Sequence, residues 1–248
     1  MVNMVQRLYE TCKDVFRNGE SGYVPPPADI QRLTAVLDGV NAEDMNLTSM
    51  RLFRRRRSRQ HDPPAIIYIH IYECRQFSIG IFCLPACGVI PLHDHPGMTV
   101  LSKLLFGSMH LKSFDWVEND ASTSIIHNAL HQGQQQGGRR LAKVKVDADL
   151  SAPCDVSVLF PAAGGNMHCF RALTPCAILD VLGPPYSQTQ ARNCTYYHDF
   201  PFTPFSSDGG ELKADVDVKG YAWLEERAKP ESFIVAPAPY SGPTILER

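Results

Sequence analysis

The chain has 248 residues, a formal net charge of −2 and 20% charged residues. This length suits one large all-β domain or two small ones, and the near-neutral charge excludes a global attraction to nucleic acid or to an anionic membrane. The segment 1–16 is too polar for a signal peptide, and no apolar run approaches the length of a membrane span. Eight cysteines without a secretory signal indicate reduced thiols. We therefore expect a protein of the cytoplasm, the nucleus or both.

The first part of the chain predicts two short helices. The apolar residues of the first recur at helical spacing and are Val5, Leu8, Tyr9, Cys12 and Phe16. Pro25, Pro26 and Pro27 then break the chain, and Asp29 is a candidate cap for a second helix. The apolar face of that helix consists of Ile30, Leu33, Leu37 and Val40.

A basic cluster, Arg54–Arg57 with Arg59, follows the helices and ends at Pro63 and Pro64. Such a cluster is a candidate nuclear import signal or a docking patch for an acidic partner. A solvated charged loop is the alternative interpretation, and the sequence leaves both open.

After Pro64 the pattern changes to short runs rich in β-branched and aromatic residues, with Gly, Pro and Asn between them. The predicted strands are Ala65–Tyr72, Phe77–Leu84, Thr99–Leu105, Ser108–Trp116, Leu141–Val146, Asp155–Phe160, His168–Leu173 and Ala177–Leu182. The polar, glycine-rich segment Gln132–Arg140 predicts a flexible hairpin loop, and Phe233–Val235 is the best late strand. So many strands without intervening helices predict a sandwich or a jelly-roll barrel.

One domain accounts for this organisation. We expect a helical N-terminal extension over 1–62, a barrel core over 63–200 and a C-terminal extension packed on the barrel over 201–248. We expect the protein to be a monomer.

The pair His93 and His95, with Asp94 between them, is the most informative part of the chain. Two histidines at i and i+2 share a face only in extended backbone, where side chains alternate. They are then two adjacent ligands for a metal, while Asp94 points to the opposite face. A later histidine, His168, follows a glycine-rich turn that begins at Pro161 and is the natural third ligand.

These two motifs together resemble those of cupins, which carry an HxH pair and then a Pro/Gly-rich turn before a later histidine. The resemblance implies an all-β fold, the cupin double-stranded β-helix or jelly-roll barrel. Many cupins add a glutamate shortly after the pair, but Met98, Thr99 and Val100 occupy that region here. Three neutral imidazoles leave the full charge on the metal, and such a centre favours an anionic soft donor such as a thiolate.

The histidines allow other interpretations. A zinc site made of Cys83, Cys87, His93 and His95 has too short a central spacer for the usual Cys2His2 fold, and Cys83 lies inside a strand-like run. The remaining histidines are more often surface or satisfied core residues than ligands, namely His70, His110, His127, His131 and His198.

A fuller resemblance covers nearly the whole chain. It rests on Phe77–Cys83, Ile90–Leu104, Gly107–Trp116, Gly164–Phe170 and Ala177–Tyr186, with Gln6–Cys12 and Pro239–Pro243 near the two ends. These stretches resemble the plant cysteine oxidases, relatives of animal cysteamine dioxygenase. The basic segment Arg51–Gln60 and the glutamine-rich loop are the least similar parts.

The resemblance implies an Fe(II) dioxygenase that adds O2 to the N-terminal cysteine of target proteins. The product is cysteine sulfinic acid, and the family thereby acts as an oxygen sensor that feeds the N-degron pathway. The implied partners are O2 and N-terminal-Cys proteins, in plants the group VII ethylene-response transcription factors, without direct binding to nucleic acid or membrane. The implied iron ligands are His93, His95 and His168.

The resemblance also implies two catalytic pocket residues. Asp180 lies in a predicted strand, where an acid costs desolvation unless it is paired, and the substrate ammonium is one partner. A backbone group or an arginine is the alternative partner. Tyr186 follows Gly183 and two prolines and could bond near sulfur or O2, or serve only in packing. Cys194 and Tyr196 fall where some thiol dioxygenases form a Cys–Tyr crosslink, and we expect none here.

Two other classes of function stay open on the sequence. A small-thiol dioxygenase for cysteamine or cysteine, or a Mn, Ni or Zn isomerase, shares the metal site but differs in its pocket. A non-catalytic cupin module uses its ligands only for folding.

Overall fold

Short strands are the main secondary structure of the described residues, as the sequence predicts. The structure, a computed structural model, describes residues 3–47, 65–117, 138–202 and 220–247. The helices are α1 (Met4–Val15) and α2 (Pro27–Asp38). The strands are β1 (Ile66–Glu73), β2 (Ser78–Leu84), β3 (Val89–His93), β4 (Thr99–Phe106), β5 (Ser108–Trp116), β6 (Arg139–Ser151), β7 (Ser157–Leu159), β8 (Met167–Ala172), β9 (Cys176–Gly183), β10 (Tyr196–Pro201), β11 (Tyr221–Arg227) and β12 (Val235–Ala238).

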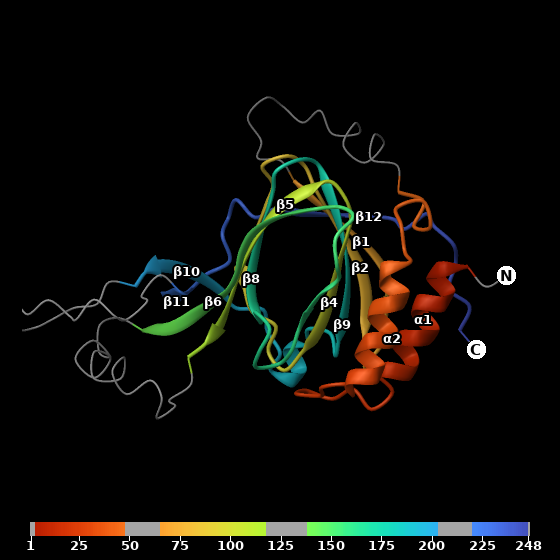
Figure 1. The fold of residues 1–248 in the computed structure, drawn as a ribbon, viewed down its shortest axis with the longest axis horizontal. Coiled ribbons are helices and arrows are strands. Elements are labelled where there is room, and N and C mark those ends of the chain that lie inside the picture. The colour runs from red at the N-terminus through yellow and green to blue at the C-terminus, as the bar shows by residue number, and fades with distance from the viewer. Residues whose placement is uncertain (1–2, 48–64, 118–137, 203–219, 248) are drawn as a thin grey trace, which may run out of the picture.

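Within these ranges the strands form two sheets that face each other (Figure 1). One has the order β12-β1-β2-β9-β4-β7, and the other closes into a barrel in the order β10-β11-β6-β5-β8-β3. Figure 1 places α1 and α2 against the outer side of the first sheet. The predicted all-β class with a jelly-roll type barrel and short N-terminal helices is therefore confirmed.

The two faces of the first sheet have different roles because side chains alternate along a strand. One set from β2 and β9 joins the core beneath the helices and consists of Ile79, Ile81, Cys83, Ala177, Leu179 and Val181. The residues between them line a cavity inside the molecule and include Ser78, Gly80, Phe82, Asp180 and Leu182. The period of two therefore places the carboxylate of Asp180 inside.

Each helix begins for an identifiable reason. The Asn3 side chain caps α1 by accepting a hydrogen bond of 2.8 Å from the Gln6 backbone N–H. The second helix begins at Pro27, which suits the first helical position because its fixed φ is already helical and it has no N–H to leave unpaired. The prediction that Asp29 caps this helix is therefore wrong. Asp29 lies in the first turn instead, where a negative charge is favourable.

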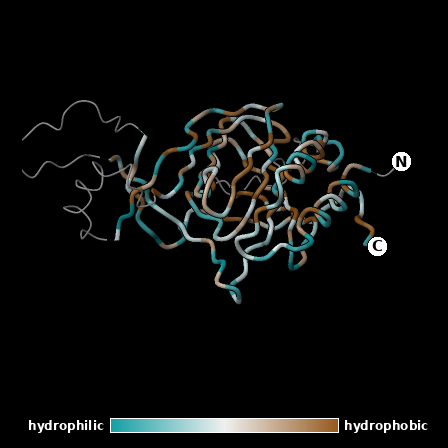
Figure 2. The backbone as a smooth tube through the Cα atoms, turned by 60° about the horizontal axis from the view of Figure 1, so that its bottom comes forward, coloured by the Kyte–Doolittle hydropathy of each residue, from teal (hydrophilic) through white to brown (hydrophobic). Residues whose placement is uncertain are grey.

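Both helices bury their apolar faces on the sheet. Leu8, Leu33 and Leu37 have no exposed surface, and they pack in one cluster with the outward side chains of β2 and β9. Hydrophobic stretches accordingly gather along the middle of the molecule (Figure 2). The segment near the C-terminus is tied to the same region, since Gln6 exchanges two hydrogen bonds of 3.0 and 2.8 Å with the Leu246 backbone.

The predicted strands agree with observed ones to within a few residues, except at three places. Strands β10 and β11 lie in regions where no strand was predicted, and β3 was expected only as extended backbone before the histidine pair. The late strand lies at Val235–Ala238, not at Phe233–Val235. Strands β11 and β12 pair with β6 and β1, and the proposed division at residues 62 and 200 stays a prediction.

Two predictions concern segments outside the described residues. They are the basic cluster Arg54–Arg57 and most of the loop Gln132–Arg140. Among the described helices, none has both the length and the apolarity that a membrane crossing requires.

Replacing Leu33 with Ala is expected to lower the free energy of unfolding by about 2–5 kcal/mol, because it leaves a cavity between α2 and the sheet. Replacing the exposed Gln31 of the same helix with Ala is the matched control and should change it by less than about 0.5 kcal/mol. Urea unfolding of both variants measures this. Equal losses in the two would contradict the docking of α2 on the sheet.

Candidate metal centre

Three histidines converge on the inside of the barrel. His93 ends β3 and pairs directly with His168 of β8, which places their side chains on one face at short distance. His95 follows two residues later. One ligand atom from each of the three lies within 4.8 Å of the others, and the ring centroids are 4.6–4.9 Å apart. The structure thus brings together all three predicted ligands.

Backbone carbonyls orient two of the rings. The His93 Nδ1 lies 2.8 Å from the Pro91 oxygen, and the His95 Nδ1 lies 2.8 Å from the Asn166 oxygen. Because a carbonyl only accepts, each Nδ1 carries the proton and each Nε2 keeps a free lone pair. This is the second partner that a metal-binding histidine typically has.

Burial keeps the three rings neutral. Desolvation lowers the pKa of His93 to about 4, against the opposing effect of hydrogen bonds to backbone. It lowers the pKa of His95 to about 3, with a further contribution from His93, and holds the pKa of His168 well below its usual range. At neutral pH a metal therefore meets three unprotonated donors and displaces no proton from them.

Asn166 fixes the position of His95, which lies beyond the end of β3. Its side-chain oxygen accepts from the His95 N–H at 3.1 Å, and its amide donates to the His95 and Phe160 carbonyls at 2.9 and 2.8 Å. The Asn166 carbonyl in turn accepts from the His95 ring. Backbone and side chain of His95 are therefore held by one residue.

Asp115 holds the loop that carries Asn166. Its carboxylate accepts from the backbone N–H groups of Gly164, Gly165 and Asn166 at 2.8–3.1 Å. Gly165 has φ +86°, and a Cβ there would lie 2.5 Å from the Ser113 Oγ, so only glycine lets the loop approach β5 this closely. The turn before His168 thus contains glycine because its backbone adopts a positive φ and lies close to β5.

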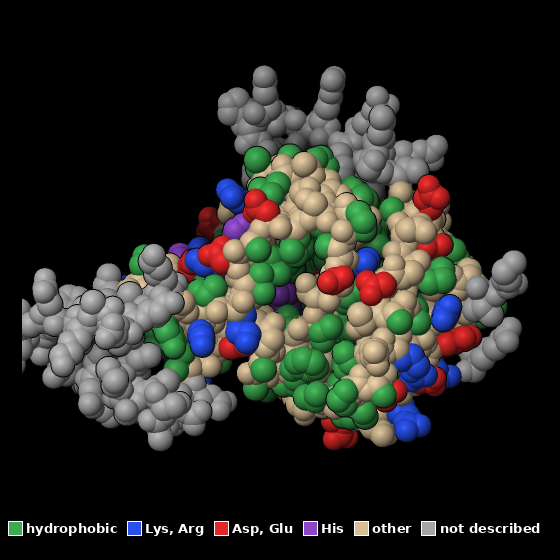
Figure 3. Space-filling view, in the orientation of Figure 1, with side chains coloured by type: hydrophobic (Ala, Val, Ile, Leu, Met, Phe, Trp, Pro, Cys, Tyr) green, Lys and Arg blue, Asp and Glu red, His purple; other side chains and the backbone are tan. Residues whose placement is uncertain are grey.

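A cavity of about 360 Å³ opens over the histidines, and Figure 3 shows a hollow with a histidine side chain inside and hydrophobic side chains around it. Its apolar wall includes Phe82, Ile90, Phe170 and Leu182. Three neutral imidazoles facing such a cavity suit a divalent transition metal that keeps open positions. The residues present therefore fit a metal ion.

Asp180 faces the same cavity from the opposite sheet. The Ser102 hydroxyl, its register partner on β4, donates to the Asp180 Oδ1 at 2.6 Å. Burial raises the pKa of Asp180 to about 7, and the Ser102 hydrogen bond only partly opposes this. No arginine or lysine pairs with this carboxylate among the described residues. At neutral pH this buried carboxyl group therefore holds its proton far more readily than an ordinary aspartate does.

Tyr186 also lines the cavity, but its hydroxyl donates to the Asp94 carbonyl at 2.6 Å. The Asp94 carboxylate accepts from the Thr195 N–H at 2.8 Å and the Tyr197 hydroxyl at 3.0 Å. Asp94 therefore links β3 to β10, and it does not belong to the histidine cluster. Burial raises the pKa of Tyr186 well above its usual value, so the phenol stays protonated.

Cys194 and Tyr196 line the cavity too, and Tyr196 pairs with His93 in the ladder. Burial raises the pKa of Cys194, and hydrogen bonds with Tyr196 and Tyr186 oppose the shift. The absence of a crosslink between Cys194 and Tyr196 stays a prediction. The zinc alternative is excluded, because Cys83 packs beneath the helices on the other face of its sheet.

Sequence reasoning missed three residues of the site. Asn166 lies inside the recognised Gly164–Phe170 motif but carried no role, and Asp115 reaches the loop from β5. Tyr68 of β1 lines the cavity, and burial with the charges of Asp180 and Glu73 raises its pKa to about 12. Only Asn166 had a signal in the sequence, namely its place in the turn before His168.

The closed barrel of short strands and the three converging histidines define a cupin fold with a candidate metal site. The PCO_ADO family model matches residues 36–245, and the chain belongs to this family of thiol dioxygenases. The resemblance to plant cysteine oxidases is thereby confirmed.

Curated relatives agree with this assignment. Plant cysteine oxidase 2 and plant cysteine oxidase 1 of Arabidopsis thaliana are 53% and 47% identical to the chain, with 98% of the chain and 83% and 81% of the relatives covered. The 2-aminoethanethiol dioxygenase of Mus musculus is 30% identical, with 99% and 98% covered. Among solved structures, an RmlC-like cupin protein from Desulfovibrio desulfuricans matches at 18% identity over 52% of this chain and 92% of its own, with a TM-score of 0.32.

Replacing Asn166 with Ala is expected to weaken metal binding about 10–100-fold, since His95 loses the groups that orient it. Titration of the metal-free protein with a divalent metal, read by calorimetry, measures this. Asn193→Ala, an exposed residue of the neighbouring loop, is the matched control and should bind as the wild type does. An unchanged affinity in the Asn166 variant would remove it from the site.

Asp180 also predicts a pH dependence of stability. Its pKa is raised in the folded state, so the stability it contributes is fully present below about pH 4 and is lost as pH rises through about 7. In the metal-free protein, wild type should therefore lose stability relative to Asp180→Asn by about 1.4 kcal/mol per pH unit across that window. Urea unfolding of both proteins between pH 4 and 8 measures the difference. A constant difference would contradict the shift.

Proposed function

We propose that this protein is an Fe(II)-dependent dioxygenase that oxidises an N-terminal cysteine of target proteins with O2 to cysteine sulfinic acid. Family membership supplies the class of reaction. The observation that carries the finer proposal is the pairing, in one cavity, of three neutral histidines with a buried carboxylate that lacks a cationic partner.

The three histidines His93, His95 and His168 would hold the iron, which activates O2 for transfer to a thiolate sulfur. Both oxygen atoms then go to sulfur, and the substrate supplies the electrons, so no external reductant enters the balance. Sulfinate formation is essentially irreversible. An irreversible product suits a degradation signal.

Asp180 and Tyr186 are the proposed pocket residues. The α-ammonium of an N-terminal cysteine is the cation that the Asp180 carboxylate lacks, and its arrival would favour the ionised form of a group whose pKa is about 7. Ser102 holds this carboxylate in place from β4. Tyr186 is proposed to pack beside the proposed iron ligand His95, since their ring centroids lie 5.7 Å apart.

The apolar wall of the cavity excludes water around the reacting sulfur. Phe82, Ile90 and Phe170 contribute no hydrogen-bonding side chain to it. The apolar side chains of this wall strengthen the attraction between the substrate ammonium and Asp180. Glu73 and Lys229 are further charged residues of the cavity lining. The cavity therefore orients a small aminothiol end group by one charge and one sulfur.

The proposed role is that of an oxygen sensor that feeds the N-degron pathway. The resemblance and the names of the relatives support N-terminal-Cys proteins as substrates, in plants the group VII ethylene-response transcription factors. We further propose a monomer that acts in the cytoplasm, the nucleus or both.

A second candidate is oxidation of a small thiol. Its support is the name of one relative, 2-aminoethanethiol dioxygenase, and the shared aminothiol group of both substrate types.

Incubation of the Fe(II)-loaded protein with an N-terminal-Cys peptide in air decides between the two candidate functions. Two added oxygens on the terminal cysteine, read from fragment ions, support the proposal. An unmodified peptide with oxidised cysteamine or cysteine favours the second candidate.

Replacing His168 with Ala is expected to abolish both iron retention and peptide oxidation, because two ligands remain. Metal content and the peptide assay measure this. The exposed His198→Ala is the matched control and should retain both. Full activity of the His168 variant would contradict the ligand assignment.

A further inference from the structure

A second pocket adjoins the metal cavity. It has a volume of about 460 Å³, within the range of roughly 300–1,000 Å³ typical of ligand sites. Glu73, Pro185 and Tyr186 line both the pocket and the metal cavity. The pocket therefore lies directly beside the cavity in which the first residue of a substrate would lie.

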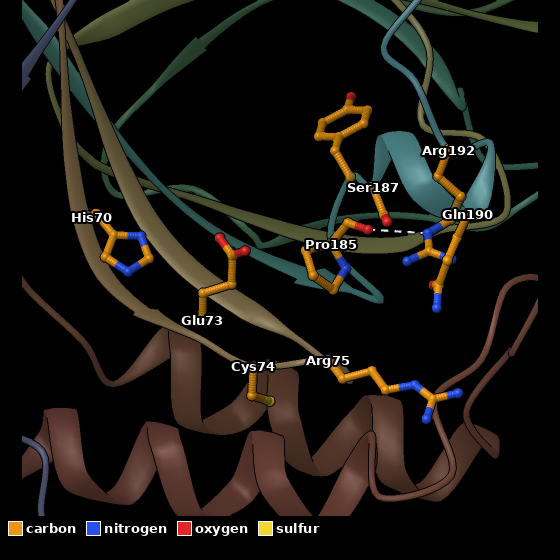
Figure 4. A pocket seen from close by; sticks show the side chains of 9 residues that line it. His70, Glu73, Cys74, Arg75, Pro185, Ser187, Gln190 and Arg192 are labelled. Carbon is orange, nitrogen blue, oxygen red and sulfur yellow. Dashed lines mark hydrogen bonds between the residues drawn. The ribbon is translucent and has the colours of Figure 1, made fainter.

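Two chain segments form the pocket walls. The end of β1 and the turn after it supply His70, Glu73, Cys74 and Arg75, and the loop after β9 supplies Pro185 to Arg192 (Figure 4). Backbone hydrogen bonds of 3.0 and 2.9 Å between Ser187 and Arg192 close this loop. The pocket is therefore built on an ordered frame.

Arg192 is a buried cation without an anionic partner. The residue is 4% exposed, and its Nε donates to the Pro185 carbonyl at 3.0 Å, as the dashed line in Figure 4 shows. Within the described ranges no carboxylate forms an ion pair with it. Its terminal N–H groups have no protein partner within the described ranges, so an oxygen acceptor in the pocket can pair with this largely desolvated cation.

Arg75 adds a second cation at the same pocket. It is exposed, and like Arg192 it makes no ion pair with Glu73 or with Glu20, which lines the adjoining hollow. The Gln190 amide lies between these cations in the lining of both hollows. The described pocket thus offers hydrogen-bond donors in excess of acceptors.

We propose that this pocket binds oxygen acceptors of the substrate polypeptide downstream of its N-terminal cysteine, with Arg192 and Arg75 as the binding residues. This inference rests on the proposed function. The acceptor is either the carboxylate of an acidic side chain or a main-chain carbonyl. Free cysteine and cysteamine end before the pocket, so the pocket separates a polypeptide substrate from a small thiol.

The test uses two kinds of N-terminal-Cys peptide and free cysteine as substrates of the iron-loaded protein. One peptide has only uncharged residues after the cysteine, and a matched series carries one Asp at successive positions. Arg192→Gln and Arg75→Gln are expected to lower kcat/KM for peptide relative to free cysteine by about tenfold or more, mainly through KM. Arg171→Gln, an exposed arginine of β8 without a described side-chain partner, is the matched control and should behave as wild type.

The outcomes distinguish the acceptors. A loss confined to one position of the Asp series identifies a side-chain carboxylate, and an equal loss on both kinds of peptide identifies main-chain carbonyls. Unchanged ratios in both variants overturn the proposal. Since Arg75 is exposed, its variant keeps the test decisive if Arg192→Gln fails to fold, which thermal unfolding shows.

Failure of the proposed function gives a different result. In that case the wild type itself oxidises no peptide. Calorimetric titration of the metal-free proteins with the same peptides then still tests the pocket. Tighter binding to wild type than to the two variants supports it, and equal binding overturns it.

Discussion

The clamp between Asn166 and His95 is the contact on which the metal centre depends. The β3–β8 ladder already sets His93 opposite His168, but His95 lies past the end of that ladder, where no strand pairing fixes it. In place of strand pairing, Asn166 forms three hydrogen bonds with His95 and one with the Phe160 carbonyl. Asp115 holds the clamp from a third strand. The arrangement of the three histidines therefore depends on the loop that carries Asn166 as much as on the strands of the barrel.

Sequence patterns within a short segment predicted the features that depend on that segment alone. Runs of β-branched and aromatic residues between turn residues indicated most strands, and the histidine spacing indicated a cluster that the structure brings together. The pocket position of Asp180 was implied only by the family resemblance. Contacts between distant segments could not be predicted. Nothing in the sequence near Asp115 indicates that its carboxylate binds a loop some fifty residues later. Pro91 within β3 obscured that strand, and the polar residues of β10 and β11 obscured theirs. The cap at Asp29 failed because a proline two residues earlier started the helix.

Asp94 and Asp180 show how surroundings give different roles to the same side chain. The Asp94 carboxylate accepts hydrogen bonds from a backbone N–H and a phenol, and these bonds link two strands. Asp180 accepts a single hydrogen bond, from the Ser102 hydroxyl, inside an apolar cavity. Ionisation of this carboxyl group is therefore costly unless a cation binds beside it. The structure agrees with the expectation that Asp94, although it lies between two of the histidines in sequence, points away from them.

The closed barrel includes a strand encoded near the end of the chain. Strand β11 lies between β10 and β6, and β10 touches His93 through Tyr196. During translation the histidines therefore leave the ribosome well before the strand that closes the ring around them. A nascent chain that stops short of Tyr221 carries every ligand but lacks the wall that joins β10 to β6. Closure of the ring of strands around the three histidines therefore depends on residues that follow all three of them in the chain.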